Sequence, residues 1–418
     1  MLEERQAARA VRLGFEVRFF NGQRSGEAST PRPCYRPAVA ETGTTTVTPE
    51  AAPRSDGRAA AKGVRGRRIH FVDLLRLLAS LQMVHGHTLD ALMAEELRSG
   101  IVYERWSWGR GLVSVAFMVA AGLSFHLSTL AIFDKHRNDR KKVLKRFRRG
   151  LWLVVLGYLL HFPAGIFSGD PAAVTASLHE FQIADVLQCI GLCILVLQTC
   201  VVVMKKPQHV VWAAAAMAVL AFSLAPLGER LSPDGPFRFL INYVTHQGGS
   251  LFPLTPWAGF VMSGVVVGEI VLPQGTRTPV EYPLPRLVAV AAAVLLIAAV
   301  AHWAPWSLIT ESTSRNAHPA FNVTKLGVVL GIISLLGVVG RRIRRLPRFL
   351  QVLAGESLML YVFHLLVIYG SGVGLYGLIG HSLSLPEAFM VALGMILLTG
   401  TVGLLWFRTK RYARERRS

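Results

Sequence analysis

The sequence predicts an all-α polytopic integral membrane protein with about ten transmembrane helices and both termini in the cytoplasm. Of its 418 residues, 52% are hydrophobic and only 17% are charged, and the mean hydropathy is +0.42. Apolar segments recur along most of the chain, each near the length of about 20 residues with which a helix crosses a bilayer. These observations are typical of a multi-pass membrane protein and not of a soluble domain.

Ten apolar segments divide the chain into a long membrane-embedded domain and two tails. They lie at about residues 71–91, 109–132, 150–168, 183–204, 209–226, 252–273, 286–304, 321–340, 357–379 and 387–407. Residues 1–66 are rich in Arg, Ala, Gly, Thr and Pro without any apolar segment, so we expect a disordered cytoplasmic tail there. We expect the membrane domain over 67–407 and a basic cytoplasmic tail over 408–418.

The loops between these segments differ in their basic residues. Alternate loops, together with the C-terminal tail, carry 24 Lys and Arg residues, whereas the other loops carry six. Because Lys and Arg concentrate on the cytoplasmic side of membrane proteins, the first helix should run outward and both termini should be cytoplasmic. The outer boundary then carries an aromatic belt made of Trp106, Trp108, Trp257, Trp303 and Trp306.

The net charge of +20 does not predict a nucleic-acid partner, because the basic residues form short runs between apolar segments. Four cysteines are present, at Cys34, Cys189, Cys193 and Cys200. They form no Cys-x-x-Cys pair and no Cys/His cluster with metal-ligand spacing, so we expect neither a metal site nor a disulfide framework.

The first apolar segment holds the ionisable side chains on which the functional interpretation of the chain is based. It carries Asp73, Arg76, His85, His87 and Asp90, although ionisable groups are costly inside a bilayer. At about 100° per residue, Arg76 and His87 differ by only about 20° around a helix, and both aspartates lie near the same line. His85 falls on the opposite face. Such a polar line usually faces a bundle interior or a wet cavity; the structural alternative is an internal Asp73–Arg76 ion pair.

Further polar residues lie at the outer ends of other segments, where they could line an outer vestibule together with Asp90. They are His161, Asp185, Gln188, Asn322 and Lys325. An interhelical ion pair between Asp185 and Lys325 explains these two equally well. The longest outer segment, 227–251, has the turn residues and aromatics of a lid or acceptor-binding loop, or of an ordinary connector.

The ninth apolar segment carries Glu356 and His364 in its inner half, and the glycine-rich stretch 370–374 predicts a bend or break beyond them.

Four sequence motifs resemble a known superfamily. RRIHFVDLLRLLASLQMVHGH, FMVAAGLSF, DVLQCIGL and GESLMLYVFHLL occur in the order found in the transmembrane acyltransferases. The closest resemblance is to bacterial relatives of the heparan-α-glucosaminide N-acetyltransferase catalytic domain, and it covers about 67–407. This resemblance implies transfer of an acyl group, acetyl in the first place, from cytoplasmic acyl-CoA to a sugar amine or hydroxyl on the extracytoplasmic side. It also implies the cytoplasmic (inner) membrane of a bacterium.

The resemblance also suggests which residues act. The related acyltransferase-3 group carries a basic residue, ten further residues and then a histidine on its first helix, and Arg76 and His87 match that spacing. In that group the histidine is taken to be essential for acyl transfer. The animal heparan enzyme has an asparagine at the position of His87 and a histidine eleven residues later, where this chain has Arg98. The match to the acyltransferase-3 group is therefore the better guide to His87.

The chemistry fits these positions. A neutral imidazole can take the proton of an attacking sugar hydroxyl or amine, so His87 is the expected general base; it could equally accept the acyl group itself. Arg76 lies about 16 Å nearer the cytoplasm along the helix, placed to bind CoA, with Asp73 orienting it. The secondary catalytic candidates are His364, Glu356 and His85.

We expect acetyl-CoA or another acyl-CoA as co-substrate, with no permanently bound cofactor. The expected partners are the lipid bilayer and an extracytoplasmic glycan or glycolipid acceptor, without nucleic acid, and a homodimer is left open. Two other functions compete. One is a secondary transporter with a His87, Asp185 and Lys325 relay. The other is a non-catalytic membrane scaffold.

Overall fold

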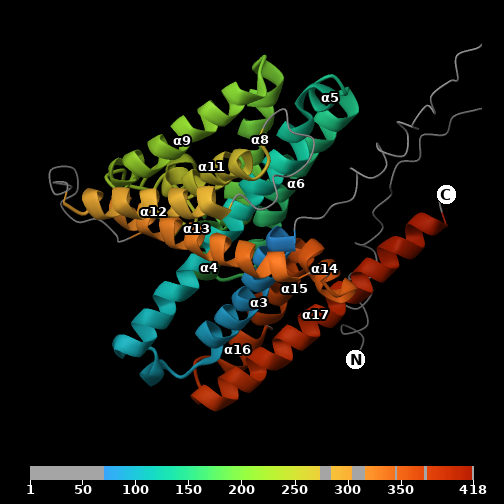
Figure 1. The fold of residues 1–418 in the computed structure, drawn as a ribbon. Coiled ribbons are helices and arrows are strands. Elements are labelled where there is room, and N and C mark those ends of the chain that lie inside the picture. Colours follow the sequence, from blue (N-terminus) through green and yellow to red (C-terminus); the bar gives the residue numbers. More distant parts are fainter. Residues whose placement is uncertain (1–69, 274–283, 304–315, 344–345, 371–373, 417–418) are drawn as a thin grey trace, which may run out of the picture. The chain divides into compact units, whose positions relative to one another are not determined.

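The computed structural model describes residues 70–273, 284–303, 316–343, 346–370 and 374–416, which are almost entirely helical (Figure 1). In this part of the chain the only β contact is an isolated parallel bridge between Met93 and Leu383. The predicted N-terminal tail, 1–66, lies outside the described residues.

The helices follow one another along the chain as predicted for a membrane domain. They are α3 (His70–Leu92), α4 (Gly100–Thr129), α5 (Phe133–Arg137), α6 (Arg140–Leu160), α7 (Pro171–Phe181), α8 (Val186–Val203), α9 (Pro207–Gly228), α10 (Arg238–Ile241), α11 (Leu254–Val271), α12 (Leu284–Ala301), α13 (Pro319–Arg342), α14 (Arg348–Gly355), α15 (Ser357–Tyr369), α16 (Leu375–Ile379) and α17 (Leu385–Glu415). Three short 3₁₀ turns, Glu95–Leu97, Leu130–Ile132 and Ala164–Phe167, join some of them.

Seven helical segments in the described residues are long and apolar enough to cross a membrane, or eight if the bent pair α14 and α15 forms one span. This confirms an all-α multi-pass membrane protein. The remaining two predicted spans are helices as well, but α3 carries charged side chains along its length and α6 begins in a basic run. The count of ten and the cytoplasmic termini stay predictions.

Close helix packing depends on glycine where α4 meets α11. A Cβ atom added to Gly122 would lie 1.8 Å from the carbonyl oxygen of Val261, and one added to Gly264 would lie 2.2 Å from that of Val119. Gly264 and Gly268 are also four residues apart, the small-residue spacing that lets membrane helices approach closely. The two backbones are therefore in direct contact, and neither glycine can be replaced without moving a helix.

Helix α3 contacts α4, α13, α14, α15, α16 and α17. Figure 1 shows α3 in blue, with α4 on one side and α15 and α17 on the other. Phe71, Leu75 and Met83 are buried in the main apolar core. A helix with so many protein neighbours can hide polar side chains from lipid, which is where intramembrane charges are tolerated.

The α14–α15 pair bends by 70° at Glu356, a bend that the sequence pattern did not predict. Both Glu356 carboxylate oxygens accept hydrogen bonds from Lys410 of α17, at 2.6 Å. The bend therefore lies at a charged side chain that another helix holds. At the other end, α15 stops at Tyr369 next to Gly370, and most of the predicted glycine-rich break, 371–373, lies outside the described residues.

Candidate functional site

The two histidines of α3 face different helices, as the helical spacing predicted. The His87 ring lies against α15, with its centroid 5.4 Å from that of His364 and 6.0 Å from that of Tyr369. The His85 ring lies 5.3 Å from Phe389 of α17. Only His87 therefore meets another imidazole, and the structure brings together two of the histidines singled out in the sequence.

Arg76 lies on the same side of α3, nearer its start. Its Nη2 donates a 2.8 Å hydrogen bond to Ser357 Oγ at the first turn of α15. Asp73 lies one turn before Arg76 on α3, but no ion pair within 4 Å joins the two in the described residues. The polar line thus runs along α15 from Ser357 to His364 and Tyr369. Ser357 was not predicted as a contact of Arg76.

Asp90, at the far end of the line, is held by two arginines. Arg110 Nη1 lies 2.8 Å from Asp90 Oδ2, and Arg98 Nη2 lies 3.8 Å from Oδ1. Arg98 also donates to the Asp90 backbone oxygen, and Tyr103 donates to its carboxylate at 3.2 Å. The Arg110 side chain packs against α3 at Gly86, where an added Cβ atom would lie 3.0 Å from Arg110 Cδ. Two cations therefore surround one carboxylate close to the His87 imidazole.

Asp185 and Gln188 form the start of α8. Asp185 Oδ1 accepts from the Val186 backbone at 2.7 Å, and Gln188 Oε1 accepts from the Asp185 backbone at 3.3 Å, a capping box. The other Asp185 oxygen accepts a 3.1 Å hydrogen bond from the Tyr361 hydroxyl and lies 4.0 Å from His161 Nε2. Asp185 therefore has a structural role at α8 and a long-range partner in α15.

Tyr361, which sequence reasoning missed, connects two groups of predicted residues. Its ring centroid lies 5.8 Å from that of His364, one turn later on α15. His161, Asp185, Tyr361, His364 and His87 therefore form one continuous run of neighbouring side chains. The cue in the sequence was the spacing of Tyr361 and His364, which places both on one face of a helix.

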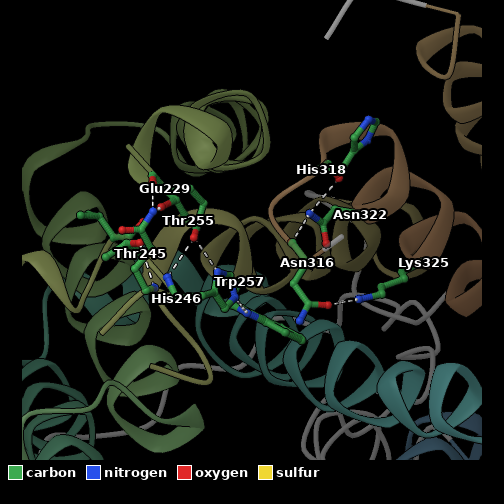
Figure 2. Close-up of polar contacts among 11 residues, drawn as sticks. Glu229, Thr245, His246, Thr255, Trp257, Asn316, His318, Asn322 and Lys325 are labelled. Carbon is green, nitrogen blue, oxygen red and sulfur yellow. Dashed lines mark hydrogen bonds and ion pairs between the residues drawn. The ribbon is translucent and has the colours of Figure 1, made fainter. Parts of the chain in front are cut away.

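Lys325 and Asn322 of α13 belong to a separate group (Figure 2). Lys325 Nζ donates to Asn316 Oδ1 at 3.3 Å and lies 4.6 Å from the ring centroid of Phe321 and 5.7 Å from that of Trp257. In the described residues it has no carboxylate partner, so the predicted alternative of an Asp185–Lys325 ion pair is not formed. The ring faces provide the compensating attraction for its buried charge.

Asn322 is nearly fully buried and fixes the chain before α13. Its Nδ2 donates to the backbone oxygens of Asn316, at 2.7 Å, and His318, at 3.1 Å. Figure 2 shows Asn316 beside Lys325, with their hydrogen bond drawn between them. The Asn322 side chain therefore shapes the surroundings of Lys325 while pointing its donor at the backbone.

The long segment 227–251 is tied to the start of α11 by a Glu229–His246–Trp257 network, also drawn in Figure 2. Glu229 Oε1 accepts from the backbone of His246 at 2.9 Å and from its Nδ1 at 2.7 Å, and Trp257 Nε1 donates to its Nε2 at 3.3 Å. Burial acts to raise the pKa of the Glu229 carboxyl, but the hydrogen bonds from His246 hold that pKa below its ordinary value. The segment is thus anchored by an ionised carboxylate.

The fold and these polar groups define a multi-pass membrane protein whose first described helix carries a partly buried polar line. A family model described as heparan-alpha-glucosaminide N-acetyltransferase, catalytic, matches residues 68–299, more than half of the chain. The chain belongs to this family of membrane acetyltransferases. No curated protein matches the sequence. The matched region contains Arg76, His87, Asp90 and Asp185, whereas α15 lies beyond it.

Proposed function

We propose that this protein transfers an acyl group, in the first place acetyl, from cytoplasmic acyl-CoA to a sugar amine or hydroxyl on the extracytoplasmic side of a bacterial cytoplasmic membrane. The observation that carries the proposal is the position of His87. It lies on a helix of an acetyltransferase-family domain, eleven residues after Arg76, with its ring against a second buried histidine. An imidazole in such a place can act as the base for the attack of the acceptor on the thioester.

In this mechanism Arg76 binds acyl-CoA near the cytoplasmic end of α3, where Ser357 orients its guanidinium and Asp73 adds a favourable charge one turn away. His87 removes the acceptor proton or carries the acyl group in a two-step reaction. Attack on the thioester places negative charge on the carbonyl oxygen. The Arg110 guanidinium, which Asp90 holds one helical turn beyond His87, is proposed to favour that charge, as pre-positioned cations do in acyl-transfer sites.

The predicted vestibule residues divide into two places for acceptor binding. Asp185 lies next to Tyr361, on the run of side chains that leads to His87, and His161 and Gln188 lie beside Asp185. Asn322 and Lys325 form the separate group near Trp257. We propose that the sugar approaches along the first group and Asp90, because that group continues to the reacting imidazole.

Acyl transfer by the purified protein tests the proposal. Protein reconstituted in liposomes should move label from radiolabelled acetyl-CoA to candidate amino sugars and oligosaccharides, and the product should be alkali-stable for an amide and alkali-labile for an ester. A wild-type protein that binds acetyl-CoA and labels no sugar or glycolipid would refute the proposed transferase. Uptake of a solute without acyl transfer would favour the transporter.

The proposed sidedness predicts labelling of single cysteines in intact cells. Ala176 on α7 and Asn138 after α5 are both exposed, and basic-residue counts place them on opposite sides of the membrane. Ala176→Cys should react with a membrane-impermeant maleimide, whereas Asn138→Cys should react only after the cells are permeabilised. The reverse pattern would invert the orientation of α3 and place Arg76 away from cytoplasmic CoA.

A conservative change at Arg76 separates donor binding from a structural role. Arg76→Lys keeps the positive charge but loses the planar donor fork, so we expect acetyl-CoA affinity to fall by about tenfold. Ser357→Ala, the matched control, removes the 2.8 Å partner of Arg76 and leaves the guanidinium in place, so affinity should fall much less. Titration calorimetry in detergent measures both. Equal losses of thermal stability with unchanged affinity would assign Arg76 to the fold.

A further inference from the structure

Two imidazoles, one from α3 and one from α15, lie side by side in the proposed site. The centroids of the His87 and His364 rings are 5.4 Å apart and their planes are inclined by 47°. The His364 side chain is fully buried and His87 is partly buried. The family match ends before α15, so nothing in it assigns a role to His364.

The hydrogen bonds of His364 determine which of its nitrogens carries the proton. Nδ1 lies 2.8 Å from the carbonyl oxygen of Leu360. A carbonyl only accepts, so Nδ1 donates, and in the neutral ring Nε2 then bears a lone pair. Nε2 is buried and has no hydrogen-bond partner in the part of the chain that the structure describes. His364 therefore presents an unused acceptor.

The neighbours of His364 leave His87 as the donor for this acceptor. The Tyr361 hydroxyl is already committed to Asp185 Oδ2, at 3.1 Å. The Tyr369 hydroxyl is aimed at the backbone oxygen of His87, at 3.4 Å. A hydrogen bond of about 3 Å between nitrogens of two imidazole rings places their centroids roughly 5.3 Å apart. The observed separation of 5.4 Å therefore already suits the bond, and although none joins the two rings in the described residues, the pair needs only a change of ring orientation to form one. Catalytic hydrogen bonds commonly shorten in this way when substrate binds.

We propose that His364 is a positioning residue for His87: Nε2 of His364 accepts the ring N–H of His87 and so fixes the tautomer of His87. This inference rests on the proposed function. The other His87 nitrogen then keeps its lone pair for the reaction, as the base of a hydrolase triad is held by its third member.

The proton and the leaving group balance in this arrangement. As the acceptor oxygen or nitrogen bonds to the thioester carbonyl carbon, its proton passes to the free His87 nitrogen. The carbon–sulfur bond then breaks, and the CoA sulfur takes that proton from His87. His364 gains no proton at any step. Its lone pair stabilises the His87 imidazolium that exists after the acceptor has attacked and before the CoA sulfur takes the proton.

The Asp185–Tyr361 hydrogen bond supports the position of the His364 ring. Asp185 is fixed at the start of α8 by the Val186 backbone, and Tyr361 packs edge-on against His364 at 5.8 Å. The buried carboxylate is thus connected to His87 through two rings. The role of Asp185 is to keep the His364 ring next to the His87 ring, because the reaction needs no protonation change of Asp185.

Kinetics with imidazole rescue test the role of His364. His364→Ala should lower kcat by about 10- to 100-fold while the KM for acetyl-CoA stays nearly constant, because the donor site on Arg76 is unchanged. Added imidazole should enter the vacated space and restore much of the rate. His126→Ala, which removes another fully buried histidine, is the matched control and should show no rescue. A His364→Ala protein with wild-type kcat, or one that loses rate without rescue, would overturn the pairing.

Nitrogen NMR tests the pairing without relying on activity. In ¹⁵N-histidine-labelled protein above neutral pH, His87, assigned from the spectrum of His87→Gln, should show a single neutral tautomer. In His364→Leu it should change to the other tautomer or to a mixture. An unchanged His87 spectrum would refute the inference even if acyl transfer is found. A tautomer controlled by His364 in a protein without transferase activity would refute the proposed function and keep the pairing.

Discussion

His87→Ala should lower acyl transfer per folded molecule by about 10²–10⁴-fold, whereas His85→Ala should retain most of it. Removal of a positioned general base costs a rate factor of this size. His87 lies between Arg76 and Asp90 on the polar side of α3 and against His364, whereas His85 packs on Phe389 of α17. Replacing a histidine that only packs lowers stability and leaves the turnover of folded molecules nearly intact.

The comparison requires detergent-purified variants that are monodisperse by size exclusion and that bind acetyl-CoA with wild-type affinity. Transfer from labelled acetyl-CoA to the acceptor is then measured at saturating donor. A His87→Ala protein with wild-type turnover would remove His87 from the mechanism. Loss of activity in His85→Ala alone would assign the role of general base to His85, on the side of α3 that faces α17.

The sequence was most informative within single elements. The separation of Arg76 and His87 fixed their common face on α3, and the structure places both against α15. The spacing likewise placed His85 on the opposite face of α3, and the structure puts its ring against Phe389 of α17. Helical phase depends only on residue spacing, so these features could be predicted without knowledge of any neighbour.

The sequence could not identify which helix lies across from each face. Arg110 reaches Asp90 from α4, twenty residues away along the chain, and Tyr361 reaches Asp185 from α15. Lys325 and Asp185 were paired by charge and depth alone, but Lys325 uses aromatic faces and Asn316 in place of a carboxylate. Such partners are set by tertiary packing, in which a cation can be satisfied by several kinds of group.

The contact between α4 and α11 should be the position where the fold tolerates substitution least. At Gly264 a Cβ atom would lie 2.2 Å from the Val119 carbonyl oxygen, and at Gly122 it would lie 1.8 Å from that of Val261. The obstructing atoms are backbone atoms, so no rotamer change can relieve the overlap and the two helices must separate. Overpacking typically costs about 1–3 kcal/mol, and a clash with backbone on a rigid helix should reach or exceed the top of that range.

Gly264→Leu should therefore lose most of its monodisperse fraction in detergent, or unfold at a clearly lower temperature, while Gly264→Ala shows a smaller loss in the same direction. Gly394→Leu on α17 is the matched control, because no atom lies within 4 Å of a Cβ atom added there. It exchanges the same residue types in another membrane helix and should unfold as the wild type does. Thermal unfolding followed by tryptophan fluorescence and size exclusion compares the three variants.

Because α4 also carries Arg110 to Asp90, separation of α4 from α11 should lower acyl transfer in the surviving folded protein as well. A Gly264→Leu protein as stable and active as Gly394→Leu would show that the α4–α11 backbones are not in contact.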